Sequence, residues 1–451
     1  MRIHFIAIGG AVMHNLAIAL KKKGMEVSGS DDEIFDPSRS RLEKYGLLPE
    51  EFGWFPDKID ESIDTIILGM HAKPDNPELI KAQQLGITIN SFPEFVYEQS
   101  KHQTRVVIAG SHGKTTITSM VIHALESCKV DCDYLVGAQL EGFEVMVKLS
   151  EKAKVMIIEG DEYLTSPMDP RPKFHLYNPN LALISGIAWD HINVFPTFDR
   201  YTKQFQIFID KIFPGGTLVY CDEDQEVVAL AKKSDSHLCK IPYQSPEYTI
   251  DENKTILNYM GERFPLHIFG HHNLLNLNGA AAVCLQLGLS RRQFYKAMES
   301  FMGSSNRLQN ILDTKNITAF RDFAHAPSKV RASVNAVKEQ FPNRKVIAFL
   351  ELHTFSSLNK DFLPYYKNTM DAADQAIVFF NPHALRLKNL EPIEKMDVEK
   401  AFGGAVMAIN SIDVFSQQVL QSIEPGCVCL FMSSGNFGGI DILNLISEKM
   451  A

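Results

Sequence analysis

Short apolar runs alternate with segments of helical periodicity along most of this chain. The apolar runs predict buried strands at residues 3–8, 27–31, 65–68, 106–109, 155–158, 181–184, 346–350, 376–380 and 428–432. The spacing of apolar residues predicts helices at residues 11–23, 114–125, 274–284 and 330–341. Short strands that alternate with helices are typical of βαβ units. The pattern therefore predicts an α/β fold built on mostly parallel sheets.

Two polar, turn-rich stretches divide this pattern. Residues 98–104 read Glu-Gln-Ser-Lys-His-Gln-Thr, and residues 303–306 read Gly-Ser-Ser-Asn. A chain of 451 residues is also long enough for roughly three domains. We therefore expect three domains, at residues 1–100, 101–302 and 303–451.

The composition argues against several classes of function. Hydrophobic residues make up 45% of the chain and charged residues 22%, which is ordinary for a globular protein. The net charge of −9 argues against a nucleic-acid partner. The seven scattered cysteines include no C-x-x-C pair, which is typical of free thiols in a reducing compartment. No signal sequence or bilayer-spanning stretch is recognisable, so we expect a cytoplasmic protein without a membrane partner.

The most informative motif is a glycine turn between a strand and a helix. The β-branched run at residues 106–109 is followed by Gly110-Ser111-His112-Gly113-Lys114-Thr115-Thr116. Such a turn directs backbone N–H groups and the positive end of the helix dipole at one point. Lys114 can then reach terminal phosphate oxygens, and the Thr115 hydroxyl can bind a phosphate-bridging Mg²⁺. We expect this loop to bind ATP; the alternative is an ordinary glycine turn.

A second glycine turn, Gly9-Gly10, ends the N-terminal strand, and the next strand ends in Ser30 and Asp31. A glycine turn followed by a strand-terminal acid resembles the layout of dinucleotide-binding domains. The full G-x-G-x-x-G pattern is absent. A substrate that is linked to a nucleotide and held by its diphosphate therefore fits better than a hydride-transfer cofactor, and a wholly structural turn remains an alternative.

Two further side chains stand where open α/β sheets place ligands. Glu159 ends the strand at residues 155–158, and His191 follows the strand at residues 181–184. With Thr115 they would complete a Mg²⁺ site, although Mg²⁺ favours oxygen ligands and a histidine is atypical. The alternatives are a helix-capping carboxylate for Glu159 and a capping or buried, hydrogen-bonded histidine for His191.

Five motifs follow one another along the chain. They are residues 110–116, Glu159-Gly160-Asp161-Glu162-Tyr163, Asp190-His191, Gly270-His271-His272-Asn273-Leu274-Leu275-Asn276 and Asp322-Phe323-Ala324-His325-Ala326-Pro327. In this order they resemble the Mur ligases, which are ATP-dependent amide-forming enzymes of peptidoglycan synthesis, and the match covers essentially the whole chain. The stretches at residues 1–4, 162–163, 169–174 and 432–439 look like the branch that attaches L-Ala-γ-D-Glu-meso-diaminopimelate to UDP-N-acetylmuramate.

The resemblance implies a fold and a set of site residues. The fold has an N-terminal Rossmann-like domain that binds the UDP substrate, a central P-loop ATPase domain and a C-terminal Rossmann-like domain that brings the amine. The implied cofactors are ATP and Mg²⁺, with Lys114 and His325 catalytic and with Thr115, Glu159 and His191 on the metal. The implied nucleotide contacts are Gly110, Ser111, His112, Gly113, Lys114, Thr115, Thr116, His272, Asn273, Arg307 and Asp322. The implied contacts to the UDP substrate are Gly9, Gly10, Ser30, Asp31 and His71.

The implied reaction begins when ATP phosphorylates the lactyl carboxylate of UDP-N-acetylmuramate. The free amine of a peptide or amino acid then attacks the acyl phosphate, and His325 would assist the loss of its proton. These substrates are small molecules, and we expect a monomer. Phe205 occupies the place where many relatives carry a carbamylated lysine, so we predict no carbamate.

The chain departs from the family pattern at Ala7, Asn306, Arg321, Ala326 and residues 351–356. Three alternatives therefore stay open. The first is an L-alanine ligase or a related amino-acid ligase of the folylpolyglutamate type. The second is an ATP-binding regulatory homologue that has lost ligation. The third is an NAD-dependent oxidoreductase, which rests only on the N-terminal glycine turn.

Overall fold

The computed structural model describes residues 1–137, 139, 143–166, 168–191, 194–304, 306–314 and 316–450. Its backbone contacts divide the chain into two compact units. The first unit comprises residues 1–189, 193–244 and 277–297. The second unit comprises residues 190–192, 245–276 and 298–451.

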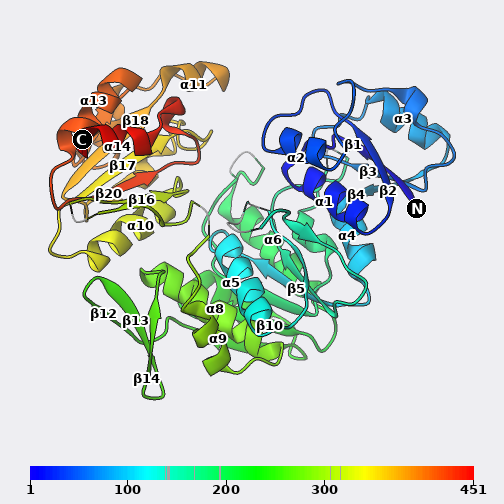
Figure 1. Cartoon of the computed structure of the whole chain (residues 1–451), viewed down its shortest axis with the longest axis horizontal. Helices are drawn as coiled ribbons and strands as arrows, with labels where there is room; N and C mark the ends of the chain where they lie inside the picture. The colour runs from blue at the N-terminus through cyan, green and yellow to red at the C-terminus, as the bar shows by residue number, and fades with distance from the viewer. Residues whose placement is uncertain are drawn as a thin grey trace. The chain divides into compact units, whose positions relative to one another are not determined.

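The first sheet of the first unit has four parallel strands in the order β2-β1-β3-β4 (Figure 1). These strands are β1 (Arg2–Ile6), β2 (Glu26–Ser30), β3 (Thr65–Leu68) and β4 (Thr88–Ser91). The helices between them are α1 (Ala11–Lys22), α2 (Ser38–Lys44), η1 (Pro56–Lys58), α3 (Pro77–Gln84) and α4 (Phe92–Ser100). Helix α4 begins at a capping box, in which the side chains of Ser91 and Glu94 each bond the other residue's backbone N–H.

The second sheet of the first unit has seven strands in the order β11-β10-β9-β5-β8-β6-β7. They are β5 (Thr104–Ala109), β6 (Asp133–Leu135), β7 (Val147–Lys148), β8 (Val155–Glu159), β9 (Leu181–Ile184), β10 (Thr217–Cys221) and β11 (Cys239–Tyr243). All neighbours are parallel except β7, which is antiparallel to β6. Because β5 lies between β8 and β9, the loops that follow these three strands meet at one edge of the sheet.

The helices that connect these strands alternate with them along the chain. They are α5 (Lys114–Ser127), η2 (Lys173–Leu176), α6 (Phe198–Asp210) and α7 (Gln225–Lys233). Two more, α8 (His271–Gln286) and α9 (Arg291–Met298), contain residues of both units.

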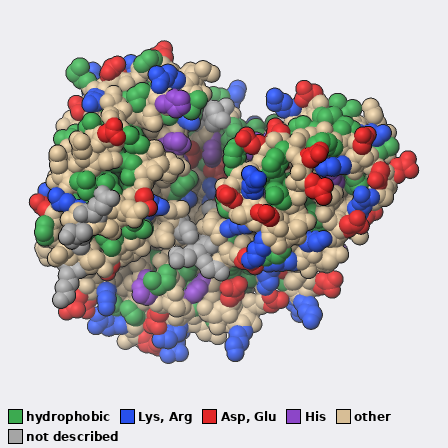
Figure 2. Space-filling view, turned by 45° about the horizontal axis from the view of Figure 1, so that its top comes forward, with side chains coloured by type: hydrophobic (Ala, Val, Ile, Leu, Met, Phe, Trp, Pro, Cys, Tyr) green, Lys and Arg blue, Asp and Glu red, His purple; other side chains and the backbone are tan. Residues whose placement is uncertain are grey.

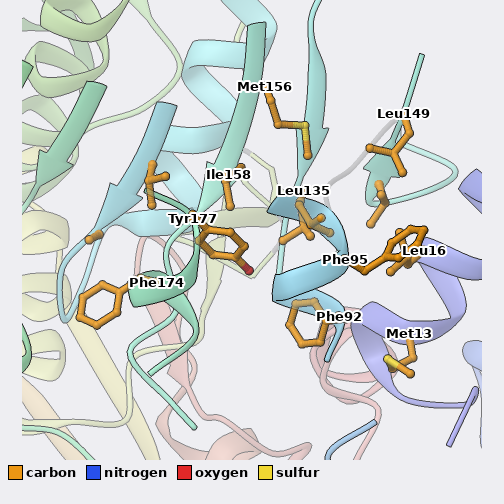
Figure 3. Close-up of a cluster of buried hydrophobic side chains, with 14 of the residues drawn as sticks. Met13, Leu16, Phe92, Phe95, Leu135, Leu149, Met156, Ile158, Phe174 and Tyr177 are labelled. Carbon is orange, nitrogen blue, oxygen red and sulfur yellow. The ribbon is translucent and has the colours of Figure 1, made fainter. Parts of the chain in front are cut away.

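One hydrophobic core joins the first two sheets. Side chains from α1 and α4 lie in the same buried cluster as side chains from the second sheet and η2 (Figure 3). The labelled members are Met13, Leu16, Phe92, Phe95, Leu135, Leu149, Met156, Ile158, Phe174 and Tyr177. The Asn15 side chain also accepts a 3.0 Å hydrogen bond from the Met146 backbone. The predicted boundary at residues 100/101 therefore separates two sheets that are packed together, and it stays a proposal.

The second unit contains a six-stranded sheet in the order β15-β16-β20-β17-β18-β19 (Figure 1). Its strands are β15 (Gln309–Asp313), β16 (Thr318–Asp322), β17 (Val346–Leu352), β18 (Gln375–Phe380), β19 (Met407–Ile409) and β20 (Val428–Met432). Strand β15 is antiparallel to β16, and the other neighbours are parallel.

A separate core covers each face of this sheet. One core contains side chains of α10 (Pro327–Gln340), η3 (Leu363–Tyr366), α11 (Pro382–Leu387) and α12 (Lys395–Ala401). The other contains side chains of α13 (Ile412–Ser422), η4 (Phe437–Gly439) and α14 (Ile442–Met450). The chain thus leaves β16 and β17 toward one face and leaves β20, which lies between them, toward the other. At such a switch point, open α/β sheets bind ligands beside the carboxyl ends of the strands.

A small antiparallel sheet also belongs to the second unit. It consists of β12 (Tyr248–Asp251), β13 (Lys254–Tyr259) and β14 (Glu262–Leu266). The Tyr248 hydroxyl donates to Glu339 of α10 at 2.6 Å, and Thr255 bonds Gln340 at 3.0 Å. Residues 245–276 therefore pack with the C-terminal sheet, although the predicted division at residues 302/303 assigns them to the central domain.

The mostly parallel α/β fold is confirmed. Strands at residues 65–68, 181–184 and 428–432 have the predicted bounds. The N-terminal strand ends two residues before the predicted Ile8, because Ala7 adopts a left-handed φ of 68°. Acidic and basic side chains are interspersed over the face drawn in Figure 2. Within the described residues, no helix has both the length and the apolar character to cross a bilayer.

Candidate active site

The predicted phosphate loop lies between β5 and α5 and is fastened to the end of β9. The backbone N–H of Ser111 donates to the Gly186 carbonyl at 2.9 Å. Gly110 has a φ of 132°, and a Cβ at this position would lie 2.1 Å from Ser185 Oγ. Gly113 has a φ of 77° and is the residue before α5. Both glycines are therefore required by the backbone, since L side chains rarely adopt these angles.

Lys114 is the first residue of α5, and its Nζ bridges the mouth of this loop. Nζ donates to the Gly110 carbonyl and to Glu162 Oε2, each at 2.7 Å. Burial lowers the pKa of Lys114, but the negative charges of Glu162 and Asp161 outweigh this effect, so the net shift is upward. The lysine is therefore a fixed positive charge beside the start of a helix, where anions bind.

The side chains of Thr115 and Glu159 are hydrogen-bonded to each other near this lysine. The Thr115 hydroxyl donates to Glu159 Oε1 at 2.8 Å, and the Gly137 N–H donates to Oε2 at 2.9 Å. Burial raises the pKa of Glu159, while the Gly137 amide, Lys114 and Thr115 lower it. A buried carboxylate beside a hydroxyl fits Mg²⁺, which prefers oxygen ligands. This pairing was predicted from the positions of the two residues in sequence.

The remaining polar residues of the loop are tied to its surroundings. Ser111 Oγ accepts from the Ala188 N–H at 2.8 Å, and the Ser185 hydroxyl donates to the His112 carbonyl. The His112 ring lies against Gly186, where an added Cβ would be 2.5 Å from its Cε1 atom. Thr116 is buried, and its carbonyl accepts from the Ser119 hydroxyl at 2.9 Å. These contacts hold the loop in one conformation.

The N-terminal glycine turn brings together four of the five residues predicted for the UDP substrate. Asp31 accepts the Gly9 N–H at 2.7 Å, and Gly10 precedes α1. Ser30 is fully buried, and its Oγ has no hydrogen-bond partner among the described residues. The fifth residue, His71, is exposed in the turn after β3. Ser30 is thus a buried hydroxyl beside the predicted diphosphate position.

Asp31 has an unusual ionisation. Burial raises its pKa to about 6, and the neighbouring Asp32 adds to this, while the Gly9 N–H acts in the opposite direction. The carboxylate therefore restrains the glycine turn and is itself sensitive to mildly acidic pH.

Three predicted residues of the second unit stand next to the ends of strands or helices: Arg307 precedes β15, Asp322 ends β16 and His325 precedes α10. Asp322 is buried and accepts from the Ser333 hydroxyl. Burial raises the pKa of Asp322, and Ser333 and Arg307 lower it. The Arg307 guanidinium carbon is 4.8 Å from the centre of the Phe323 ring. The charge of Arg307 thus acts on Asp322, and the contact of both residues with the nucleotide stays a prediction.

His325 lies in the same region as a half-buried, neutral ring. Its Nδ1 donates to the Phe323 carbonyl at 2.8 Å, so Nε2 is the acceptor nitrogen of the neutral ring. Burial, with the positive charge of Lys329, lowers the pKa of His325 to about 4. Lys329 Nζ lies 3.4 Å from Asp190 Oδ2. The sequence analysis missed Lys329, although it follows His325 by four residues.

His191 and the adenine-contact residues complete the predicted set. The His191 N–H donates to Asp190 Oδ1 at 2.8 Å, and His191 has a φ of 54°. Asn273 is buried and donates to the Phe269 carbonyl at 3.1 Å, while His272 is half-buried at the start of α8. His191 belongs to the second unit, and Thr115 and Glu159 belong to the first. Their common metal site stays a prediction.

Two sequence-family models match the chain. The Mur ligase middle domain matches residues 108–284, and the catalytic domain of the Mur ligase family matches residues 2–104. The UDP-N-acetylmuramate–L-alanine ligase of Syntrophomonas wolfei is 30% identical, with 78% of this chain and 77% of that protein covered. The UDP-N-acetylmuramate–L-alanyl-γ-D-glutamyl-meso-2,6-diaminoheptandioate ligase of Escherichia coli is 27% identical, with 98% and 96% covered.

Solved structures show the same fold. The UDP-N-acetylmuramate–alanine ligase of Thermotoga maritima has a TM-score of 0.72 at 20% identity, with 100% of this chain and 99% of that chain covered. The murein peptide ligase of Psychrobacter arcticus has a TM-score of 0.66 at 22% identity, with 100% and 98% covered.

Proposed function

Because this chain belongs to the Mur ligase family of ATP-dependent acid–amino-acid ligases, we propose that it joins UDP-N-acetylmuramate to L-Ala-γ-D-Glu-meso-diaminopimelate. The reaction forms an amide through an acyl phosphate, and the product would return recycled peptide to peptidoglycan synthesis. We assign the protein a cytoplasmic location and a monomeric state.

The observation that carries the activation step is the contact between Thr115 and Glu159 beside Lys114. Lys114 and the N–H groups of the loop would neutralise charge on the transferred phosphoryl group as the lactyl carboxylate attacks it. Thr115, Glu159 and His191 would hold Mg²⁺, which supplies further positive charge to the phosphate oxygens when bound.

The carboxyl end of β20 is our candidate site for the incoming amine. It is bordered by the loop after β20, which contains Ser433 and Gly435, and by His353 after β17. Glu351 is buried beneath it and accepts from Ser433 and from the Phe437 N–H. The neutral His325 would accept a proton from the attacking amine, because its Nε2 carries no hydrogen.

Two observations support the tripeptide as the amine. The similarity to the Escherichia coli tripeptide ligase extends over 98% of this chain. Two of the stretches on which the resemblance to that branch rests, residues 162–163 and 432–439, follow the ends of β8 and β20, where ligands bind in such sheets.

The second candidate is an L-alanine ligase, which the 30% identical relative from Syntrophomonas wolfei favours. The two candidates differ only in the amine, so both share the ATP and UDP-N-acetylmuramate sites described above.

A ligation assay with a panel of amines decides between them. The purified protein is mixed with ATP, Mg²⁺ and UDP-N-acetylmuramate, and then with L-alanine, L-Ala-γ-D-Glu or the tripeptide. We expect amide product and stoichiometric phosphate release with the tripeptide. Product with L-alanine alone would replace the tripeptide assignment, and nucleotide binding without phosphate release from any mixture would indicate a regulatory homologue.

A further inference from the structure

The buried carboxylate of Glu162 has no part in the mechanism above, yet it contacts the lysine on which that mechanism depends. Only 1% of its side chain is exposed, against 15% for Lys114. Its Oε2 atom lies 2.7 Å from Lys114 Nζ, which also donates to the Gly110 carbonyl. Two acceptors on different segments therefore fix the direction in which Nζ points.

A tyrosine from a third segment connects this carboxylate to the phosphate loop. The Tyr201 hydroxyl on α6 lies 3.2 Å from Glu162 Oε1 and 3.0 Å from Ser111 Oγ. Tyr201 is fully buried, and its ring packs edge-on against Phe205 at 5.3 Å. The contacts run from Ser111 through Tyr201 and Glu162 to Lys114. The bond from Lys114 Nζ to the Gly110 carbonyl returns to the residue next to Ser111. A shift of any member would move the others.

The charge of Glu162 is unfavourable for holding a nucleotide. A carboxylate beside the position of a triphosphate repels it, and this repulsion is strong in a buried site. Glu162 therefore cannot serve to increase affinity for ATP. What it supplies is a fixed place for Nζ, and such preorganised charge matters most when new charge develops in the transition state.

We propose that Glu162 is a positioning residue for phosphoryl transfer, and that Tyr201 couples it to the phosphate loop. Glu162 holds Lys114 Nζ across the loop mouth, so that the ammonium group is in place before the carboxylate of the substrate attacks ATP. This inference rests on the proposed ATP-dependent ligation, and it assigns to that reaction two residues that the phosphate-loop motif does not contain.

The test compares Glu162→Gln with the unmodified protein in steady-state kinetics. Glutamine keeps the shape but removes the charge that holds Nζ, so we expect kcat to fall at least about tenfold while the KM for ATP falls or stays within about threefold of its original value. Tyr201→Phe removes only a hydroxyl from a buried ring, and we expect a fall in kcat in the same direction and of about threefold or more. Direct ATP binding to each variant is measured in parallel.

Tyr243→Phe is the matched control. Tyr243 is also a buried tyrosine of the first unit, and its hydroxyl has no hydrogen-bond partner among the described residues. We expect its kinetics to equal those of the unmodified protein.

Several results would overturn the inference. They are an unchanged kcat in both variants, a raised KM with unchanged kcat, or a fall in kcat of the same size in Tyr243→Phe. If Glu162→Gln does not fold, the Tyr201→Phe result decides alone. Ligation by the unmodified protein tests the proposed function separately, so an active parent with unaffected variants counts only against the role of Glu162.

Discussion

Lys114 is paired with a buried carboxylate, and this pairing determines what its removal does to the protein. Lys114→Ala should abolish product formation, because the charge that faces the transferred phosphoryl group is lost. It should also lower the free energy of unfolding by about 3–5 kcal/mol, because the buried carboxylate of Glu162 loses its 2.7 Å contact with the ammonium group. Product formation and thermal unfolding of the variant check the two expectations.

A double variant separates activity from stability at this position. In Lys114→Ala combined with Glu162→Gln, the buried negative charge is removed together with the ammonium group, so most of the lost stability should return while ligation stays absent. Substantial turnover by either lysine variant would contradict the role of Lys114 at the phosphate.

The ionisation of Asp31 makes the stability of the folded protein depend on pH, and the direction of this effect follows from the pKa shift. Its pKa in the folded protein is about 6, against an ordinary value of 3.8, so the folded state binds its proton more tightly than the unfolded chain does. This contribution to stability is fully present below about pH 4 and is lost as the pH rises through about 6. Asp31→Asn cannot ionise, so its stability relative to the parent should increase between pH 4 and pH 7. Urea unfolding at several pH values measures this difference, and a difference that stays constant with pH would be evidence against it.

At the residue scale, the sequence predicts those contacts that follow from a motif. Lys114, Thr115 and Glu159 could be found because a glycine turn and a strand end determine where their side chains lie. Tyr201 could not be found, because its contact with Ser111 joins residues 90 positions apart and depends on how α6 packs. Lys329 had a local signal, since it lies in the first turn of α10, only four residues after His325.

The β5–loop–α5 element depends on backbone conformations that only glycine adopts easily. In Gly110→Ala the new Cβ would meet Ser185 Oγ at 2.1 Å, at a φ of 132°. We expect nucleotide binding to be lost and the protein to be destabilised by at least about 2 kcal/mol. Nucleotide titration and thermal unfolding measure the two effects.

Gly215→Ala is the control for this change. Gly215 has a φ of 76°, but a Cβ there would have nothing within 4 Å. Only backbone strain applies, so we expect a loss of about 1 kcal/mol and unchanged ATP binding. Equal effects of the two alanines on binding would show that the contact with Ser185 is unimportant.

At the element scale, periodicity predicts the interiors of strands better than their ends. The strand at residues 65–68 is fully buried, and its apolar run and its bounds coincide. The strand predicted at residues 3–8 stops at Ile6, because Ala7 turns left-handed where a glycine would be expected. Strand β17 extends beyond the predicted Leu350 to Leu352, since the polar Glu351 is buried by its contacts with the β20 loop.

The two units have separate cores, which predicts that the whole molecule does not unfold in one step. Phe205 is fully buried in the first unit, and Phe349 stacks on Phe431 at 4.6 Å in the second. Phe205→Ala and Phe349→Ala should each remove about 3–5 kcal/mol from the unit concerned. Calorimetry should show each variant lowering a different transition. A single transition that moves equally in both would contradict independent units.

The grouping of sheets around common cores has no local signal in the sequence. Polar stretches mark where sheets begin and end, but they do not reveal which sheets share a core. The antiparallel strands at residues 248–266 precede α8 in sequence, yet Tyr248 and Thr255 bond α10. Such grouping depends on contacts between residues far apart in sequence, which local patterns do not contain.

The common core of the first two sheets fixes the distance between two of the proposed binding sites. On the proposed roles, one site is the glycine turn that binds the sugar nucleotide, and the other is the loop that binds the transferred phosphoryl group. The packing of Met13, Leu16, Phe92 and Phe95 keeps the distance between them constant. In a compound whose carboxylate lies nearer to its pyrophosphate, or farther from it, the carboxylate would not be in position to attack the phosphoryl group. Discrimination by substrate length would then arise from side chains that touch no substrate at all.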